Sequence, residues 1–271
     1  MLTVLSLGAG VQSSTLALMA AAGEITPMPD CAIFSDTGWE PRQVYEWLSW
    51  LETKLPFPVH RVGVGNIRDD QMSGRRSVGK GGGGNKRFAS MPYFVKYPDG
   101  SKGMTKRQCT LEYKIEPIER FMRRTLLGIK PRARIPKGAV VEQWRGISAD
   151  ESYRMKPSRV PWIKVRYPLA MELGMSRGGC LAWMARNGFP KPPRSACIGC
   201  PFHSDQEWLE IRNRPEEWAE AVAYDKAIRK SCGMNGETFL HEDRIPLDQV
   251  QFRADRQRDM WGNECEGMCG V

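Results

Sequence analysis

Short apolar runs and amphipathic stretches alternate along the first half of the chain. Two apolar runs predict buried strands at residues 3–7 and 31–35, and two further strands are predicted at residues 59–62 and 140–147. Three stretches with apolar residues at helical spacing predict helices, over residues 15–22, 41–55 and 115–127. Strands and helices that alternate with short turns indicate an α/β fold with a mostly parallel sheet.

The pattern changes after residue 205. Tryptophan and charged residues at helical spacing over residues 205–231 predict a mainly helical C-terminal region, and the end of the chain is acidic and irregular. We therefore expect an α/β domain over residues 1–205. A helical extension over residues 206–271 follows it and ends in a tail that contains cysteines.

The composition distinguishes globular proteins from membrane, collagen-like and disordered chains. The chain has 271 residues, of which 41% are hydrophobic and 26% are charged, as is typical of soluble globular proteins. It contains no run of about 20 apolar residues that could span a membrane, and its start shows no basic, apolar leader. We therefore exclude membrane proteins, collagens and disordered chains, and we expect a cytoplasmic protein, either a monomer or a homo-oligomer.

Charge is concentrated in the middle of the chain. Residues 61–205 contain 29 Lys and Arg against 11 Asp and Glu, a net charge of +18, whereas the segments on either side are acidic. The basic part includes Arg75, Arg76 and a glycine-rich loop at residues 79–87. Such asymmetry favours a phosphate-rich partner, either a nucleotide or a nucleic acid. A solvated basic surface is the plain alternative.

The turn after the first predicted strand has the composition of an anion-binding loop. It contains glycines and serines between a buried strand and a helix, namely Ser6, Gly8, Gly10, Ser13 and Ser14. Glycines let the backbone approach an anion, and the free amides at a helix N-terminus then bind its oxygens. The loop matches neither a Walker loop nor a dinucleotide fingerprint, so an ordinary glycine turn is the alternative.

Four segments of the chain together carry a family resemblance. SLGAGVQSS at residues 6–14 is similar to the PP-loop of the adenine-nucleotide alpha-hydrolase superfamily. FSDTGWE at residues 34–40 is similar to the Asp-Thr-Gly segment of the phosphoadenosine phosphosulfate (PAPS) reductase family. RQCTLEYKIEP at residues 107–117 resembles its Cys-Cys-x-x-x-Lys-x-x-Pro stretch. RGISADESYR at residues 145–154 resembles its Gly-x-Arg-x-x-Glu-Ser-x-x-Arg segment.

This resemblance implies a Rossmann-like three-layer sandwich that binds ATP or another adenine nucleotide, with or without Mg²⁺. The predicted nucleotide-binding residues are those of the first turn together with two that follow the second strand: Ser6, Gly8, Gly10, Ser13, Ser14, Asp36 and Thr37. Lys114 and Arg154 match family positions that face the substrate phosphate. Two departures are the missing PP-loop Asp, where Gln12 or Ser13 stands, and Ser148 in place of an Arg.

Four cysteines are candidate metal ligands. Cys197 and Cys200 form a C-x-x-C turn, which by itself is compatible with a redox pair, a zinc site or a structural role. The resemblance to cluster-bearing family members implies a [4Fe–4S] cluster held by Cys109, Cys180, Cys197 and Cys200, with zinc as the alternative. His203 is a candidate replacement for one of these cysteines.

The C-terminal tail contains two further cysteines. ECEGMC at residues 264–269 is similar in placement to the mobile tail of PAPS-type reductases, which carries a catalytic cysteine. Cys265 and Cys269 are therefore candidate catalytic residues, and a frayed tail without function is the alternative.

Three functions are compatible with these features. The first, which the basic middle segment favours, is ATP-dependent sulfur transfer (thiolation) to a nucleic acid with the help of a sulfur donor. The second is reductive cleavage of an adenylyl sulfate to sulfite by a tail cysteine and a thiol reductant. The third is a non-catalytic, metal-stabilised module that binds nucleic acid.

Overall fold

The computed structural model describes residues 1–73, 91–135, 137–138, 141–230 and 235–253. A five-stranded sheet runs in the order β3-β2-β1-β6-β7, and every neighbouring pair is parallel. Its strands are β1 (Leu2–Leu7), β2 (Cys31–Asp36), β3 (Val59–Gly63), β6 (Val141–Arg145) and β7 (Ile163–Arg166). The chain order reverses between β1 and β6, and ligands of open α/β sheets bind beyond the carboxyl ends of strands at such a point.

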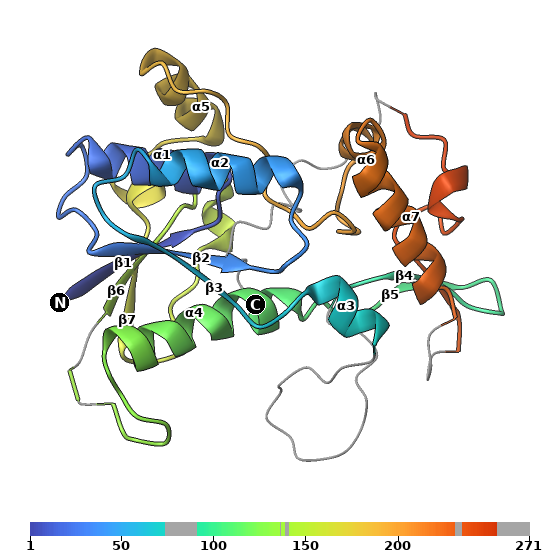
Figure 1. Cartoon of the computed structure of the whole chain (residues 1–271), viewed down its shortest axis with the longest axis horizontal. Helices are drawn as coiled ribbons and strands as arrows, with labels where there is room; N and C mark the ends of the chain where they lie inside the picture. Colours follow the sequence, from blue (N-terminus) through green and yellow to red (C-terminus); the bar gives the residue numbers. More distant parts are fainter. Residues whose placement is uncertain (74–90, 136, 139–140, 231–234, 254–271) are drawn as a thin grey trace.

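Helices cover both faces of this sheet. On one face lie α1 (Val11–Ala21), α2 (Arg42–Glu52) and α5 (Arg177–Arg186). The opposite face is covered by a continuous helical run of three segments, η1 (Thr110–Ile115), α4 (Glu116–Phe121) and η2 (Met122–Leu126) (Figure 1). Each face has its own apolar core, so β1, β2 and β6 are buried on both sides. The three-layer α/β class is confirmed.

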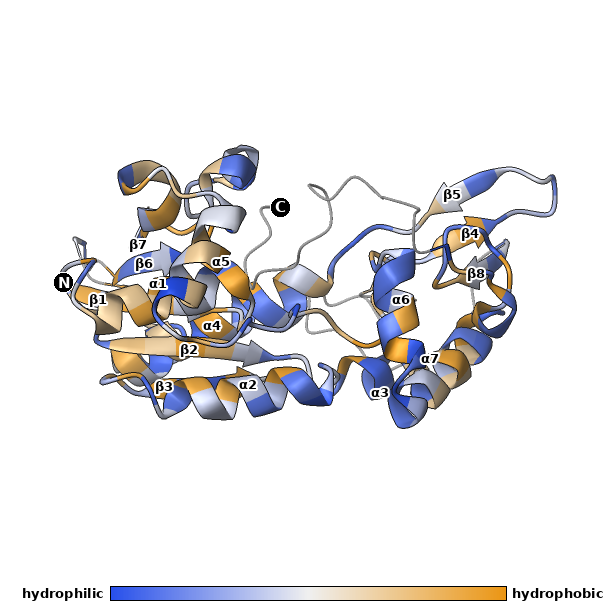
Figure 2. Ribbon diagram, turned by 90° about the horizontal axis from the view of Figure 1, so that it is seen from above, coloured by the Kyte–Doolittle hydropathy of each residue, from blue (hydrophilic) through white to orange (hydrophobic). Residues whose placement is uncertain are grey.

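A second lobe contains the C-terminal helices. Its elements are α3 (Ile67–Met72), α6 (Asp205–Arg212), α7 (Pro215–Ile228), and an antiparallel sheet of β4 (Phe94–Lys96), β5 (Lys102–Met104) and β8 (Glu237–Phe239) (Figure 2). Because β4 pairs with β8, the hairpin of residues 94–104 packs with the helical extension. The second lobe therefore contains residues from before and from after residue 205.

Element boundaries follow local capping chemistry. Ser204 and Glu207 form a capping box that starts α6. α6 ends at Arg212, and Pro215 begins α7 three residues later, because proline is tolerated in the first turn of a helix but not in its interior. The helix predicted over residues 205–231 is therefore two helices. Three short 3₁₀ or π segments complete the described elements, η3 (Ala149–Arg154), η4 (Pro168–Glu172) and η5 (Leu247–Gln249).

No described helix is long and apolar enough to cross a membrane.

Candidate functional site

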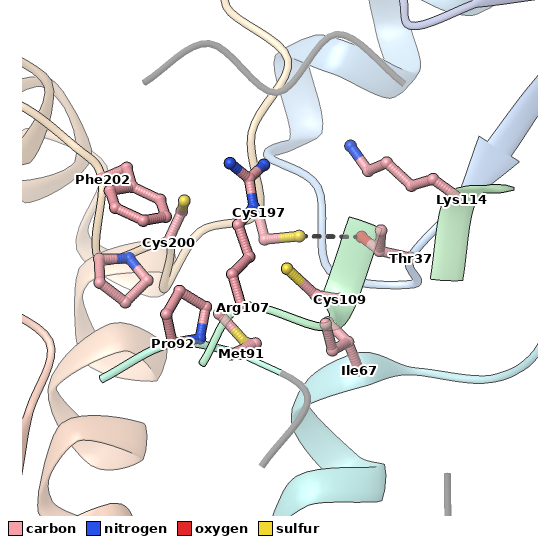
Figure 3. A pocket seen from close by; sticks show the side chains of 11 residues that line it. Thr37, Ile67, Met91, Pro92, Arg107, Cys109, Lys114, Cys197, Cys200 and Phe202 are labelled. Carbon is pink, nitrogen blue, oxygen red and sulfur yellow. Dashed lines mark hydrogen bonds between the residues drawn. The ribbon is translucent and has the colours of Figure 1, made fainter. Parts of the chain in front are cut away.

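A pocket lies beyond the carboxyl end of β2, where the two lobes meet. Three cysteines line it: Cys197 and Cys200 from one turn, and Cys109 from the residue before η1 (Figure 3). Thr37 and Lys114 form the side toward the sheet. The remaining wall is largely apolar and consists of Ile67, Met91, Pro92, Arg107, Pro201 and Phe202. We call this the cysteine pocket.

Cys197 is the most enclosed of the three thiols. Its Sγ lies 3.2 Å from Thr37 Oγ1, within hydrogen-bond distance, and 3.9 Å from Glu40 Oε1. Burial and the neighbouring Glu40 carboxylate raise the pKa of the Cys197 thiol well above its usual value, while Lys114 opposes this shift. Cys109 and Cys200 are partly exposed. The thiols of the pocket therefore occupy different environments.

A buried ion pair adjoins the Cys197 thiol. Lys114 Nζ lies 3.6 Å from Glu40 Oε1, and the two side chains are 6% and 0% exposed. The same Glu40 oxygen accepts a hydrogen bond from Thr37 Oγ1 at 3.2 Å. Buried charges persist only when they are paired and hydrogen-bonded, so this arrangement fixes Lys114 at the edge of the pocket.

The C-x-x-C turn is held by contacts with both lobes. The Ile198 amide donates to the Trp39 carbonyl at 2.9 Å, and His203 Nε2 donates to the Cys197 carbonyl at 2.9 Å. Burial and nearby Arg194 lower the pKa of His203 to about 3, so its ring is neutral. Gly199 packs on the Trp39 ring so closely that an added Cβ would lie 2.2 Å from it.

The predicted anion loop lies at the same edge of the sheet, at the end of β1. Ala9 adopts a left-handed conformation with φ of 57°, and Gly10 precedes the first turn of α1. The serine hydroxyls are buried and have protein partners: Ser13 Oγ accepts from the Gly8 amide at 3.1 Å, and Ser14 Oγ accepts from Trp47 Nε1 at 2.9 Å. The backbone amides at the N-terminus of α1 are therefore the groups suited to an anion.

The segment after β6 packs on this loop. An added Cβ at Gly146 would lie 2.7 Å from the Ser13 backbone, so the two turns are in close contact. Gln12 Nε2 donates to Glu151 Oε2 at 3.2 Å, and Arg154 Nη1 donates to the same oxygen at 2.7 Å. Arg154 is thus engaged with Glu151, next to the predicted nucleotide loop.

Asp36 and Ser6 complete the predicted nucleotide set. Asp36 Oδ1 accepts from Tyr45 Oη at 2.8 Å and from the Gly38 amide at 2.7 Å. Ser6 Oγ accepts from Gln143 Nε2 at 2.7 Å. The structure therefore gathers the predicted residues of both strands at one edge of the sheet.

Cys180 lies away from the cysteine pocket. It is fully buried on α5, in the apolar core formed with α1, whereas Cys197 belongs to the core of the second lobe. The four-cysteine set that we predicted is therefore divided, three members at the pocket and one elsewhere. Within the described ranges, no group of three or more His, Cys, Asp or Glu side chains has a geometry that would hold a metal ion. The donor set as it stands does not fit a four-ligand cluster.

Other predicted features lie outside the described residues. They are the tail cysteines Cys265 and Cys269, the pair Arg75 and Arg76, and the glycine-rich loop at residues 79–87.

Two charged residues of this edge were missed by sequence reasoning. One is Glu40, the partner of Lys114. The other is Arg145, the last residue of β6, which is only 8% exposed. Arg145 Nη2 donates to Gln143 Oε1 at 3.1 Å, its buried Nε has no hydrogen-bond partner, and burial lowers its pKa. A charged residue at the carboxyl end of a buried strand, or within four residues after it, is the sequence signal that could have found both.

The sequence matches no protein-family model and no curated protein. Among solved structures, the chain is similar to the crystal structure of phosphoadenylyl-sulfate (PAPS) reductase from Candida auris in complex with phosphate. The TM-score is 0.42 and the sequence identity is 15%, over 70% of this chain and 74% of that chain. The fold assignment given above rests on the strand order and register of this chain.

Proposed function

We propose that the protein is an enzyme of sulfur chemistry that binds an adenine nucleotide at the carboxyl edge of its sheet. One observation carries the proposal: Thr37, predicted to line the nucleotide site, is within hydrogen-bond distance of the Cys197 thiol at 3.2 Å. A nucleotide bound at the ends of β1 and β2 would therefore lie beside a pocket lined by three thiols.

The charges at this edge support an anionic ligand. The amino end of α1 presents backbone amides and the positive end of the helix dipole. Arg145 is a buried guanidinium beside the end of β1, with no carboxylate in ion-pair range among the described residues, and all its acceptors are neutral. Removing such a cation from water is costly unless an anion offsets it. A bound phosphate would do so.

The reaction that we propose is sulfur transfer to a nucleic acid. An oxygen of the acceptor attacks the α-phosphorus of ATP, and pyrophosphate leaves. A hydrosulfide ion, supplied by a sulfur donor, then attacks the activated atom, and AMP leaves with the original oxygen. One bond to oxygen is replaced by one bond to sulfur, without any net oxidation or reduction.

The residues of this chain have separable roles in that scheme. The anion loop and Arg145 hold the phosphates, and Lys114 offsets negative charge at the edge of the pocket. Thiols are the protein groups that bind sulfur species and soft metals. We therefore assign Cys109, Cys197 and Cys200 to binding the sulfur that is transferred.

The decisive experiment supplies the anaerobically purified protein with ATP, sulfide and a mixture of duplex DNA and transfer RNA. We expect AMP, pyrophosphate and thionucleosides, detected by chromatography and mass spectrometry of the digested nucleic acid. Cys197→Ser should abolish thionucleoside formation. Cys31→Ser is the matched control, because Cys31 is buried inside β2, away from the pocket.

A parallel reaction with an adenylyl sulfate and a thiol reductant tests the reductase chemistry. Release of sulfite there, without thionucleosides in the first reaction, would replace the proposed transfer with reductive cleavage. Absence of any nucleotide binding by calorimetry would refute both reactions.

A further inference from the structure

The far end of the helical run Thr110–Leu126 is unusually basic. From residue 120 to residue 141 the sequence contains seven Arg and Lys and no Asp or Glu. Three of the cations lie on the helix and four in the segment that follows it: Arg120, Arg123, Arg124, Lys130, Arg132, Arg134 and Lys137. They are exposed or partly exposed. We call this set the basic surface.

None of these seven cations forms an ion pair with a described carboxylate. Elsewhere on the molecule, comparable arginines do so: Arg42 with Glu46, and Arg61 with Glu52, both at 2.7 Å. Arg166 likewise pairs with Glu172 at 2.7 Å. A solvated face of ordinary composition mixes both signs of charge. The basic surface therefore carries a local excess of positive charge that the protein itself does not neutralise.

The cations of the helix and of the following turn are tied together. Arg123 Nη2 donates to the Ala133 carbonyl, which places the turn of residues 130–134 against the end of the helix. Arg132 adopts φ of 67°, a left-handed conformation that costs a residue with a side chain about 1 kcal/mol or more. The turn is therefore held in place, and Arg132 occupies a strained position on it.

We propose that the basic surface binds the phosphodiester backbone of a nucleic acid. Five of its seven cations are arginines, whose planar forks match phosphate oxygens. Insertion into a membrane would require exposed large apolar side chains beside the cations, and the described part of this segment presents none. This inference rests on the nucleic-acid substrate of the proposed function and assigns the surface that docks it.

The geometry relates this surface to the cysteine pocket. Cys109 lines the pocket and directly precedes the helical run, whereas Arg124 lies near the end of that run. An α-helix rises about 1.5 Å per residue, and the π-helical segments η1 and η2 rise less, so the fifteen residues from Cys109 to Arg124 span at most about 22 Å. With a spacing of about 3.4 Å per base pair, a duplex that touches both would span no more than about seven base pairs. Phosphate contacts of this kind position a nucleic acid without reading its sequence.

The test measures binding alone. A fluorescein-labelled 20-bp DNA duplex and a 20-nucleotide single-stranded RNA are titrated with the full-length protein over a series of salt concentrations. The variant Arg124→Glu/Arg134→Glu reverses two exposed cations. The matched control, Lys96→Glu/Lys102→Glu, makes the same change of charge at a cross-strand pair of the β4–β5 hairpin.

We expect the first variant to bind at least one of the two probes about 50-fold more weakly at 0.1 M salt. The slope of log K against log salt should fall by about two, since each phosphate contact contributes about 0.9 on a duplex. The control should retain the wild-type affinity within about threefold. Circular dichroism and urea unfolding establish that both variants are folded.

Two results would overturn the inference: no binding of either probe by the wild-type protein, or an equal loss of affinity in the two variants. Failure of the proposed function looks different. In that case the wild-type protein binds a probe through the basic surface but incorporates no sulfur from ATP and sulfide.

Discussion

The two ends of the helical run Thr110–Leu126 place positive charge in opposite environments. At its start, Lys114 is buried and faces Glu40 at 3.6 Å, beside the Cys197 thiol. At its end lies Arg124, and the segment that follows contains Arg134; both are exposed and lack a carboxylate partner among the described residues. A positive charge is thus held in a buried ion pair at one end, whereas at the other end several exposed positive charges act together on the solvent.

This difference determines how each end should respond to change. A buried charge acts at short range in a medium of low polarity, so removal of one partner is costly and salt screens the pair poorly. Exposed charges act through their sum, and screening weakens them over about 10 Å at 0.1 M salt. Substitutions at the first end should therefore alter stability, and those at the second end should alter only salt-dependent binding.

The largest effect is expected from Lys114→Met. The substitution leaves the Glu40 carboxylate, which is 0% exposed, without its lysine. We expect a loss of about 3–5 kcal/mol in the free energy of unfolding, measured with urea. Lys130→Met at the exposed end is the control and should change it by less than about 0.5 kcal/mol. The double variant Lys114→Met/Glu40→Gln should recover at least half of the loss. A single variant within 1 kcal/mol of wild type would contradict the buried pair.

The second effect concerns the turn that carries two of the pocket thiols. In Gly199→Ala the new Cβ would lie 2.2 Å from the Trp39 ring, so the turn must shift. We expect a loss of about 1–3 kcal/mol in the free energy of unfolding and faster alkylation of the Cys197 thiol, measured by mass spectrometry. Gly178→Ala is the control, because its Cβ meets nothing closer than Ser176 Oγ at 3.7 Å. Equal behaviour of the two variants would argue against tight packing at the turn.

The third effect separates the cysteines by location. Alkylation of each thiol is to be measured by mass spectrometry in the folded, anaerobically purified protein. We expect Cys109 and Cys200, which are partly exposed at the pocket, to react faster than the fully buried Cys180. Cys180→Ser should lose about 1–2 kcal/mol of stability, since it places a hydroxyl in an apolar core. Alkylation of Cys180 as fast as that of Cys200 would contradict its position in that core.

The sheet could be predicted from the sequence because its signal is local. The first three segments predicted as strands correspond to β1, β2 and β3 within one or two residues. The short strand β7 and the β4–β5 hairpin were not predicted. They are three or four residues long, and they gain stability from pairing with β6 and β8 rather than from any periodicity of their own.

The site could be predicted only in part, for a related reason. Motifs identified Thr37, Lys114 and the C-x-x-C turn, and the fold brings these together. Spacing along the chain suggested Cys180 as a further ligand, but its position is decided by the packing of α5 on α1, which no motif encodes. The partner of Lys114 was missed for the same reason, because the contact joins residues 74 positions apart in the sequence.

The smallest effect comes from a carboxyl group between the two ends of the helical run. Glu119 on α4 is mostly buried, and burial raises its pKa above the ordinary value of 4.5 although Arg159 opposes the shift. Its protonated form therefore favours the fold. That contribution is fully present below pH 4.5 and is lost as the pH rises through the raised pKa. Glu119→Gln should thus be slightly more stable than wild type at pH 7, by less than about 1 kcal/mol, with no difference at pH 4.

Glu172→Gln provides a control of opposite sign. Arg166 lowers the pKa of Glu172, so its stabilising contribution is present above the ordinary value of 4.5 and is lost as the pH falls. Glu172→Gln should have a lower free energy of unfolding than wild type at pH 7, and the difference between the two proteins should shrink in acid. Urea unfolding at the two pH values measures both changes. If Glu119→Gln instead weakened the fold at pH 7, the ion pair with Arg159 would outweigh the cost of burying the Glu119 carboxylate. A carboxylate on α4 would then stabilise the fold in its charged form, as Glu40 does at the start of the helical run.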